Sequence, residues 1–149
     1  MRAIVVHIEN FGNGLHSLLY VSRVSDTETV LIDTDIDSIV EISQRNNSAL
    51  AVTGLLLAHA GYFIQVLEGS HATISALVGR IALDPRHTDL KVLATAPISQ
   101  RAFGRWAMRA GRPPAETAVA GFDPYAMDPK ALMALLSFSG VLATRRKAA

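Results

Sequence analysis

Apolar residues recur along this chain with two different periods, and the changes between them predict alternating strands and helices. Alternation at every second position predicts strands at residues 16–22, 90–98 and 101–109 and a hairpin at 51–68. Spacings of three and four predict helices at residues 34–46, 70–84 and 129–144. The order β-α-β-β-α-β-β, with a helix appended, is typical of a ferredoxin-like split βαβ fold of the α+β class. We therefore expect a mixed five-stranded sheet with two helices on one face and the C-terminal helix on the other.

These elements divide the chain into three regions. Residues 1–15 contain a Gly-Asn-Gly turn signal and form an N-terminal extension. Residues 16–110 form the folded domain. Residues 111–149 form a linker and a C-terminal helix, which either caps the sheet or provides a dimer seam and the output.

Composition restricts the classes of protein to consider. The chain has 149 residues, 18% of them charged, a net charge of +1 and no cysteine. These values fit one globular domain, give no electrostatic reason to expect nucleic acid, and exclude disulfides and thiolate chemistry. No apolar run is long enough for a membrane span, and the five histidines lack metal-ligand spacing. We expect a cytoplasmic protein without a metal.

A glutamine in the most apolar strand provides the first candidate for function. Gln65 lies between Phe63 and Leu67 on one strand face, where an unpaired amide would cost about 1–3 kcal/mol. The first and third strands are central neighbours in a split βαβ sheet, so Tyr20 can lie near Gln65. Polar residues on the two flanking helices, among them Asn47, would then border a slot suited to a planar small molecule.

Several short motifs carry a resemblance to a known family. They are Tyr-Val-Ser at 20–22, Asn-Asn at 46–47, Thr-Gly at 53–54, Phe-Ile-Gln-Val-Leu-Glu-Gly at 63–69, Asp-Pro-Arg-His at 84–87, Arg-Ala-Phe at 101–103 and Trp-Ala-Met at 106–108. In this order, covering about residues 15–110, they resemble a BLUF domain, the blue-light sensor that uses flavin adenine dinucleotide (FAD).

The resemblance implies a flavin ring between the two helices, with the family's tyrosine and glutamine at Tyr20 and Gln65. Light would drive an electron and a proton from Tyr20 through Gln65, leaving the amide rotated or tautomerised. A stronger hydrogen bond to the flavin C4 carbonyl would then shift its absorption to the red. The residues expected to bind FAD are Tyr20, Ser22, Ser43, Asn46, Asn47, Gln65, Arg80, Asp84, Arg86 and His87.

The resemblance also implies how a signal leaves the pocket. Trp106 or Met108 on the fifth strand would respond to Gln65, and the C-terminal helix would receive the change. We expect no catalytic turnover, and an output through contacts in a homo-oligomer or with another protein.

Simpler interpretations stay open for each of these residues. Gln65 could be a satisfied core amide, Asn46 and Asn47 a helix C-cap, and Arg80 with Asp84 a surface i,i+4 pair. Two other functions compete: a small ferredoxin-like enzyme, such as an acylphosphatase or monooxygenase, and a flavin-free interaction module. An RNA-binding sheet is disfavoured because no paired aromatic motif lies on a central strand.

Overall fold

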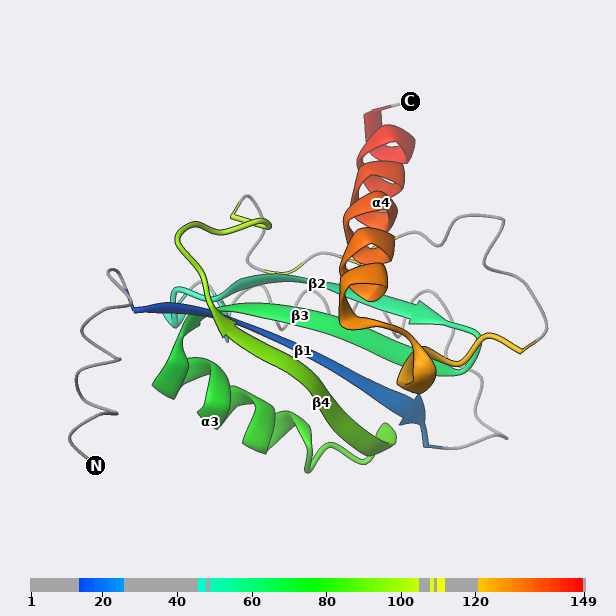
Figure 1. Ribbon diagram of the computed structural model, residues 1–149, viewed down its shortest axis with the longest axis horizontal. Coiled ribbons are helices and arrows are strands. Elements are labelled where there is room, and N and C mark those ends of the chain that lie inside the picture. Colours follow the sequence, from blue (N-terminus) through cyan, green and yellow to red (C-terminus); the bar gives the residue numbers. More distant parts are fainter. Residues whose placement is uncertain are drawn as a thin grey trace.

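The computed structural model describes residues 14–25, 46–47, 49–104, 108, 110–111 and 121–148, with side chains up to residue 140. Figure 1 shows its elements. They are β1 (Leu15–Val24), β2 (Thr53–His59), β3 (Tyr62–Ser70), α3 (His71–Ile81), β4 (His87–Pro97), the 3-10 helix η2 (Pro124–Ala126) and α4 (Pro129–Ala148).

The four strands form one sheet in the order β2-β3-β1-β4, and every neighbouring pair is antiparallel. Within this sheet Gln65 on β3 lies directly opposite Tyr20 on β1 and opposite Leu56 on β2. The prediction of an α+β protein is confirmed. The central position of β1 and β3 is also observed, so the expected proximity of Tyr20 and Gln65 follows from the register.

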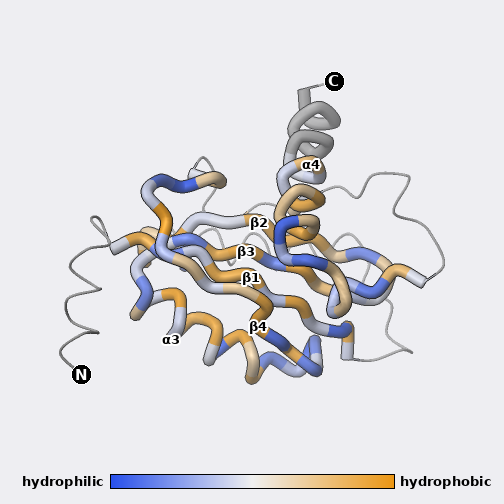
Figure 2. Tube along the Cα trace, viewed as in Figure 1, coloured by the Kyte–Doolittle hydropathy of each residue, from blue (hydrophilic) through white to orange (hydrophobic). Residues whose placement is uncertain are grey.

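Alternating side chains give the sheet two buried faces, and among the described elements α3 covers one of them and α4 the other (Figure 1). On one face Leu18, Tyr20 and Leu67 pack with Ile74 and Val78 of α3. On the other face strand residues pack with Leu132 and Leu136 of α4. Figure 2 shows hydrophobic stretches on the strands that are interrupted by hydrophilic positions. The C-terminal helix therefore lies on the face opposite α3, as expected.

Helix α3 begins where the sequence predicts and ends earlier. The Ser70 hydroxyl caps it by accepting a hydrogen bond from the Thr73 backbone N–H at 3.2 Å. The helix ends at Ile81, three residues before Asp84 and well before Pro85. Residues 82–86 form a turn, and β4 begins at His87, which places the Asp-Pro-Arg-His motif at the entrance to that strand.

The predicted fifth strand is wrong over its first four residues. Residues 101–104 form bends and a turn, because the side chain of Glu68 binds the backbone N–H groups of Ala102 and Phe103 that a strand would need for pairing. An isolated parallel bridge joins Ala110 to Leu56, and residues 105–107 and 109 lie outside the described part. The count of five strands, the mixed sheet and the complete ferredoxin-like topology therefore stay predictions. The first predicted helix also lies outside, except that residues 46, 47 and 49 are helical.

Helix α4 meets the sheet through a close contact at Gly111. A Cβ at this position would lie 2.2 Å from the Ser139 Oγ and 3.0 Å from the Ser139 Cβ. Only glycine lets the chain approach α4 this closely. The end of α4 that carries the C-terminus projects away from the sheet (Figure 1). Within the described residues, we find no helix with the length and apolar character that crossing a membrane requires.

The chain before α4 is fixed to the end of the sheet by a group of aromatic rings. The Arg23 guanidinium lies 5.3 Å from the ring centroid of Tyr62 and 5.1 Å from that of Tyr125. The Tyr125 hydroxyl also donates a hydrogen bond to the Asp89 carbonyl at 2.7 Å. These contacts set the point from which α4 starts across the sheet.

Candidate functional site

A buried chain of three side chains lies on the α3 face of the sheet. The Tyr20 hydroxyl donates a hydrogen bond to Oε1 of Gln65, and Nε2 of Gln65 donates to Sδ of Met108 at 3.3 Å. The three residues are 3%, 5% and 1% exposed. Tyr20 and Gln65 are brought together by strand pairing, and Met108 comes from the segment that follows β4.

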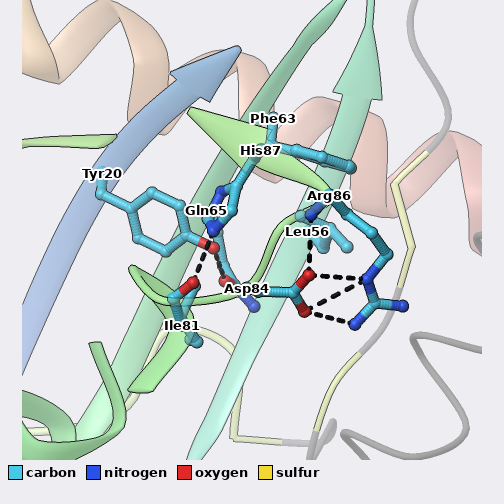
Figure 3. A pocket seen from close by; sticks show the side chains of 8 residues that line it. All are labelled: Tyr20, Leu56, Phe63, Gln65, Ile81, Asp84, Arg86 and His87. Carbon is cyan, nitrogen blue, oxygen red and sulfur yellow. Dashed lines mark hydrogen bonds and ion pairs between the residues drawn. The ribbon is translucent and has the colours of Figure 1, made fainter. Parts of the chain in front are cut away.

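A pocket opens beside the hydrogen-bonded side chains of Tyr20 and Gln65 (Figure 3). Its apolar lining comes from Leu56, Phe63 and Ile81. The hydrogen-bonding groups that line it belong to Tyr20, Gln65, Asp84, Arg86 and His87. The pocket thus combines apolar walls with a few polar groups, which is the usual composition of a small-molecule site.

His87 is held between β1 and the end of α3. Its Nε2 lies 2.5 Å from the Ile81 carbonyl, which can only accept, so Nε2 carries the hydrogen. In the neutral ring Nδ1 then accepts from the Ser22 hydroxyl at 2.8 Å. Ser22 is completely buried behind His87 and is not among the residues lining the pocket. Its expected contact with FAD stays a prediction.

Asp84 and Arg86 form a two-pronged ion pair at the pocket (Figure 3). The Arg86 Nε and Nη2 donate to the two carboxylate oxygens at 3.0 and 2.5 Å. These hydrogen bonds lower the pKa of Asp84. The interpretation of Arg80 with Asp84 as a helical i,i+4 pair is wrong, because α3 ends at Ile81 and Asp84 bonds to Arg86 instead. Arg80 is exposed on α3 and is not among the lining residues, so its contact with FAD stays a prediction.

The environment of Tyr20 keeps its phenol protonated. Burial raises the pKa of Tyr20 far above the ordinary value of 10.0, and the negative charge of Asp84 raises it further. Tyr20 is therefore a hydrogen-bond donor to Gln65 over the whole neutral range.

This shift predicts a loss of stability at alkaline pH. The unfolded chain releases the Tyr20 proton near its ordinary pKa while the folded protein retains it, so the free energy of unfolding falls as pH rises above about 10. We expect this fall to be smaller in Tyr20→Phe, by up to about 1.4 kcal/mol per pH unit. Denaturant unfolding from about pH 9 to about pH 11 measures it. If the 13Cζ chemical shift of Tyr20 shows that the phenol ionises near pH 10 in the folded protein, the expectation is contradicted.

The remaining predicted residues are placed as follows. Asn47 is buried, and its backbone carbonyl accepts a hydrogen bond from the Val52 N–H at 2.8 Å. Asn46 is exposed. Ser43 and Trp106 lie outside the described residues. The sequence placed Phe63 on the face of Gln65 but did not single out Leu56 or Ile81 as lining residues. Leu56 could have been found by counting back from the turn at Gly61, because that count places it opposite Gln65.

A family model matches most of this chain. The model of the BLUF family, described as sensors of blue-light using FAD, matches residues 15–109, which is well over half of the chain. This chain belongs to the BLUF family. Membership confirms the resemblance seen in the sequence, and with it FAD as the cofactor. It favours the flavin photosensor over the enzyme and the flavin-free module that the sequence left open.

This chain spans less than a quarter of the length of two curated relatives that it matches. The match to the photoactivated adenylate cyclase subunit beta of Euglena longa is 34% identical over 111 residues, covering 74% of this chain and 12% of that protein. The blue light- and temperature-regulated antirepressor of Escherichia coli (strain K12) is 34% identical over 94 residues, covering 63% of this chain and 23% of that protein.

Solved structures include proteins of similar size. The dark-state structure of the BLUF protein BlrB has a TM-score of 0.68 and 31% identity, covering 85% of this chain and 94% of that one. The photo-activated state of BlsA has a TM-score of 0.75, covering 85% of this chain and 95% of that one, and with 22% identity it supports the fold alone.

The pocket beside Tyr20 and Gln65 has groups suited to a flavin. A flat aromatic ring requires apolar walls and hydrogen-bonding groups at one edge, and Leu56, Phe63, Ile81 and Gln65 line the pocket. Among the described side chains, Tyr20 and Met108 use two of the four hydrogen-bonding positions of the Gln65 amide. With respect to the described residues, one N–H and one lone pair of this amide are available to a ligand.

Proposed function

We propose that this protein is a blue-light sensor in which Tyr20 and Gln65 form the photoactive pair and Met108 carries the change outwards. The observation that carries the proposal is the buried chain Tyr20–Gln65–Met108 at the edge of the pocket. Asn46, Asn47, Asp84, Arg86 and His87 are proposed to bind FAD, together with Ser22, Ser43 and Arg80.

Tyr20 is the proposed electron donor. Bound FAD supplies a ring that becomes a strong one-electron oxidant when it absorbs blue light. Tyr20 then loses one electron and its hydroxyl proton, which moves through the Gln65 amide, and later regains both, so no net oxidation occurs. The existing hydrogen bond from the Tyr20 hydroxyl to Gln65 Oε1 supports this route, because the proton to be moved already points at the amide.

After the electron and the proton have returned to Tyr20, the Gln65 amide stays rotated. Rotation exchanges Oε1 and Nε2, so Nε2 would donate to the Tyr20 oxygen and Oε1 would face the Met108 sulfur. A thioether sulfur accepts hydrogen bonds and cannot donate them, so the rotated amide would set two acceptors against each other. Met108 must then move away. The contact of 3.3 Å between Nε2 and Sδ therefore couples the amide orientation to the position of Met108.

The output is proposed to pass from Met108 to α4. Residues 110 and 111 follow shortly after Met108, and Gly111 packs against Ser139 of α4. A displacement of Met108 would be transmitted through this contact to the helix. We propose that the response is a change in how α4 contacts a second copy of the chain or another protein, without catalytic turnover. A cytoplasmic location stays a prediction.

The visible spectrum before and after blue light tests the photosensor. We expect the FAD-loaded protein to show a flavin spectrum that shifts reversibly to the red after illumination. Tyr20→Phe should still bind FAD and lose the shift, because the electron and proton donor is gone. Tyr62→Phe is the matched control, because this tyrosine also lies in the sheet but is not among the pocket residues, and it should respond like the wild type. A protein that stays colourless after reconstitution with FAD would rule the proposal out.

A further inference from the structure

Glu68 is a buried carboxylate that lies three residues after Gln65 on β3. It is 1% exposed and points to the α4 face, since it shares strand parity with Ile64 and Val66. Its Oε1 accepts hydrogen bonds from the Thr53 hydroxyl at 2.9 Å and the Phe103 N–H at 3.0 Å. Its Oε2 accepts from the Ala102 N–H at 2.7 Å. Both oxygens thus accept from backbone donors that cannot accept in return.

These hydrogen bonds fix the backbone of residues 102 and 103. Burying a carboxylate costs several kcal/mol unless hydrogen bonds compensate it, and bonds to a charged acceptor are stronger than neutral ones. The energetic cost of leaving Glu68 unpaired therefore holds Ala102 and Phe103 against β3. This accounts for the turn at 101–104 in place of the predicted strand.

Arg101 brings a positive charge to the same place. Its Nη1 donates to the Thr53 hydroxyl at 2.9 Å and to the Glu68 backbone carbonyl at 3.0 Å, and its Nη2 donates to the Ala51 carbonyl at 2.8 Å. The Thr53 hydroxyl accepts from Arg101 and donates to Glu68, so it links the cation to the carboxylate. The network joins both strands of the hairpin to the start of the chain that leads to Met108.

Met108 lies between this network and a second attachment. At the far end the Gly111 N–H donates to the Leu56 carbonyl at 2.7 Å, beside the parallel bridge from Ala110 to Leu56. We call the described residues 101–104, 108, 110 and 111 the Met108 segment. Glu68 binds near its start and Leu56 binds its end, and both residues lie on the strands that also position Gln65.

We infer that Glu68 is a positioning residue of the sensor: its carboxylate fixes the start of the Met108 segment and thereby holds the Met108 sulfur against Gln65. The inference rests on the proposed function only for its effect on the light response. Phe103 extends the same attachment to α4, because it packs in the cluster that contains Leu132 and Leu136. Glu68 therefore sets the position of Met108 relative to α4, the helix proposed to receive the signal.

Glu68→Gln in the FAD-loaded protein tests this inference. The side chains have nearly the same shape, but the amide NH2 must face either the Ala102 N–H or the Phe103 N–H, which sets donor against donor. In the dark we expect the exchange of these two amide hydrogens to accelerate at least tenfold and the methyl resonance of 13C-labelled Met108 to shift. After illumination the red shift should keep its amplitude, while the rate of dark recovery changes at least threefold.

Two further variants separate positioning from a general loss of structure. Asp89→Asn removes one negative charge at an exposed site away from the segment and should leave all of these readouts unchanged. Thr53→Val removes one of the three donors to Glu68 among the described residues, together with the hydroxyl that accepts from Arg101. It leaves both backbone donors in place, so it should change the same readouts in the same direction by a smaller factor. It provides the test if Glu68→Gln does not fold.

The outcomes distinguish the two proposals. A wild-type protein without a light-induced shift refutes the proposed function, while the dark amide exchange and the Met108 resonance still test Glu68. An unchanged Met108 resonance and an unchanged recovery rate in folded Glu68→Gln, or in Thr53→Val where it replaces that variant, overturn the inference. A shifted Met108 resonance together with a changed dark recovery rate, at retained FAD affinity and red-shift amplitude, supports the inference.

Discussion

Replacing Gln65 by leucine is expected to abolish the light-induced red shift completely while FAD stays bound. Leucine fills a similar volume in the buried strand, so the walls formed by Leu56 and Phe63 should remain. It offers no acceptor to the Tyr20 hydroxyl and no donor to the Met108 sulfur, so both hydrogen bonds of the buried chain disappear. Without an amide, the site has no group that can relay the proton or keep two orientations.

Absorption spectra in the dark and after blue light measure this prediction. Gln100→Leu is the matched control, because it makes the same chemical change at an exposed bend after β4 and should respond like the wild type. The buried Tyr20 hydroxyl loses its partner in Gln65→Leu, which costs about 1–3 kcal/mol, partly offset by the burial of an apolar side chain. A Gln65→Leu protein that still shifts reversibly to the red would show that the amide is not the switching group.

The part of the site that could be predicted from the sequence is the part set by strand pairing. Period-two alternation placed Gln65 on the face of Phe63 and Leu67, and the order of the strands brought it to Tyr20. Both inferences depend on the backbone ladder alone, which repeats regularly. The position of α4 on the opposite face followed from the need to cover a second apolar surface.

The part that could not be predicted depends on single polar contacts. The alternation of residues 101–109 is compatible with a strand, but the N–H groups of Ala102 and Phe103 donate to the Glu68 carboxylate and not to a neighbouring strand. Likewise, residues 80 and 84 have helical spacing, yet the chain leaves the helix at Ile81 and Asp84 bonds to Arg86. A hydropathy pattern does not indicate which backbone N–H groups a buried carboxylate will bind. The end of the helix at Ile81 and the turn at 101–104 therefore become visible only in the structure.

The second large effect is expected at Gly54, where replacement by alanine should destabilise the protein by about 3 kcal/mol. A Cβ at Gly54 would lie 2.1 Å from the Val66 carbonyl oxygen and 3.2 Å from its carbon. Both are backbone atoms of β3, so they cannot yield by changing a rotamer. The two strands would have to separate, and Val66 is the residue next to Gln65. We therefore expect a loss of stability together with a disturbed dark spectrum of the bound flavin.

Gly79→Ala provides a control with the same chemical change and the opposite expected sign. Gly79 is exposed within α3, and a Cβ there would meet nothing within 4 Å. Alanine is the better helix former by about 0.5–1 kcal/mol, so this variant should be more stable than the wild type. Denaturant unfolding of all three proteins at one saturating FAD concentration measures both changes. Equal stability of Gly54→Ala and the wild type would contradict the close approach of β2 to β3, and with it the register that places Leu56 opposite Gln65.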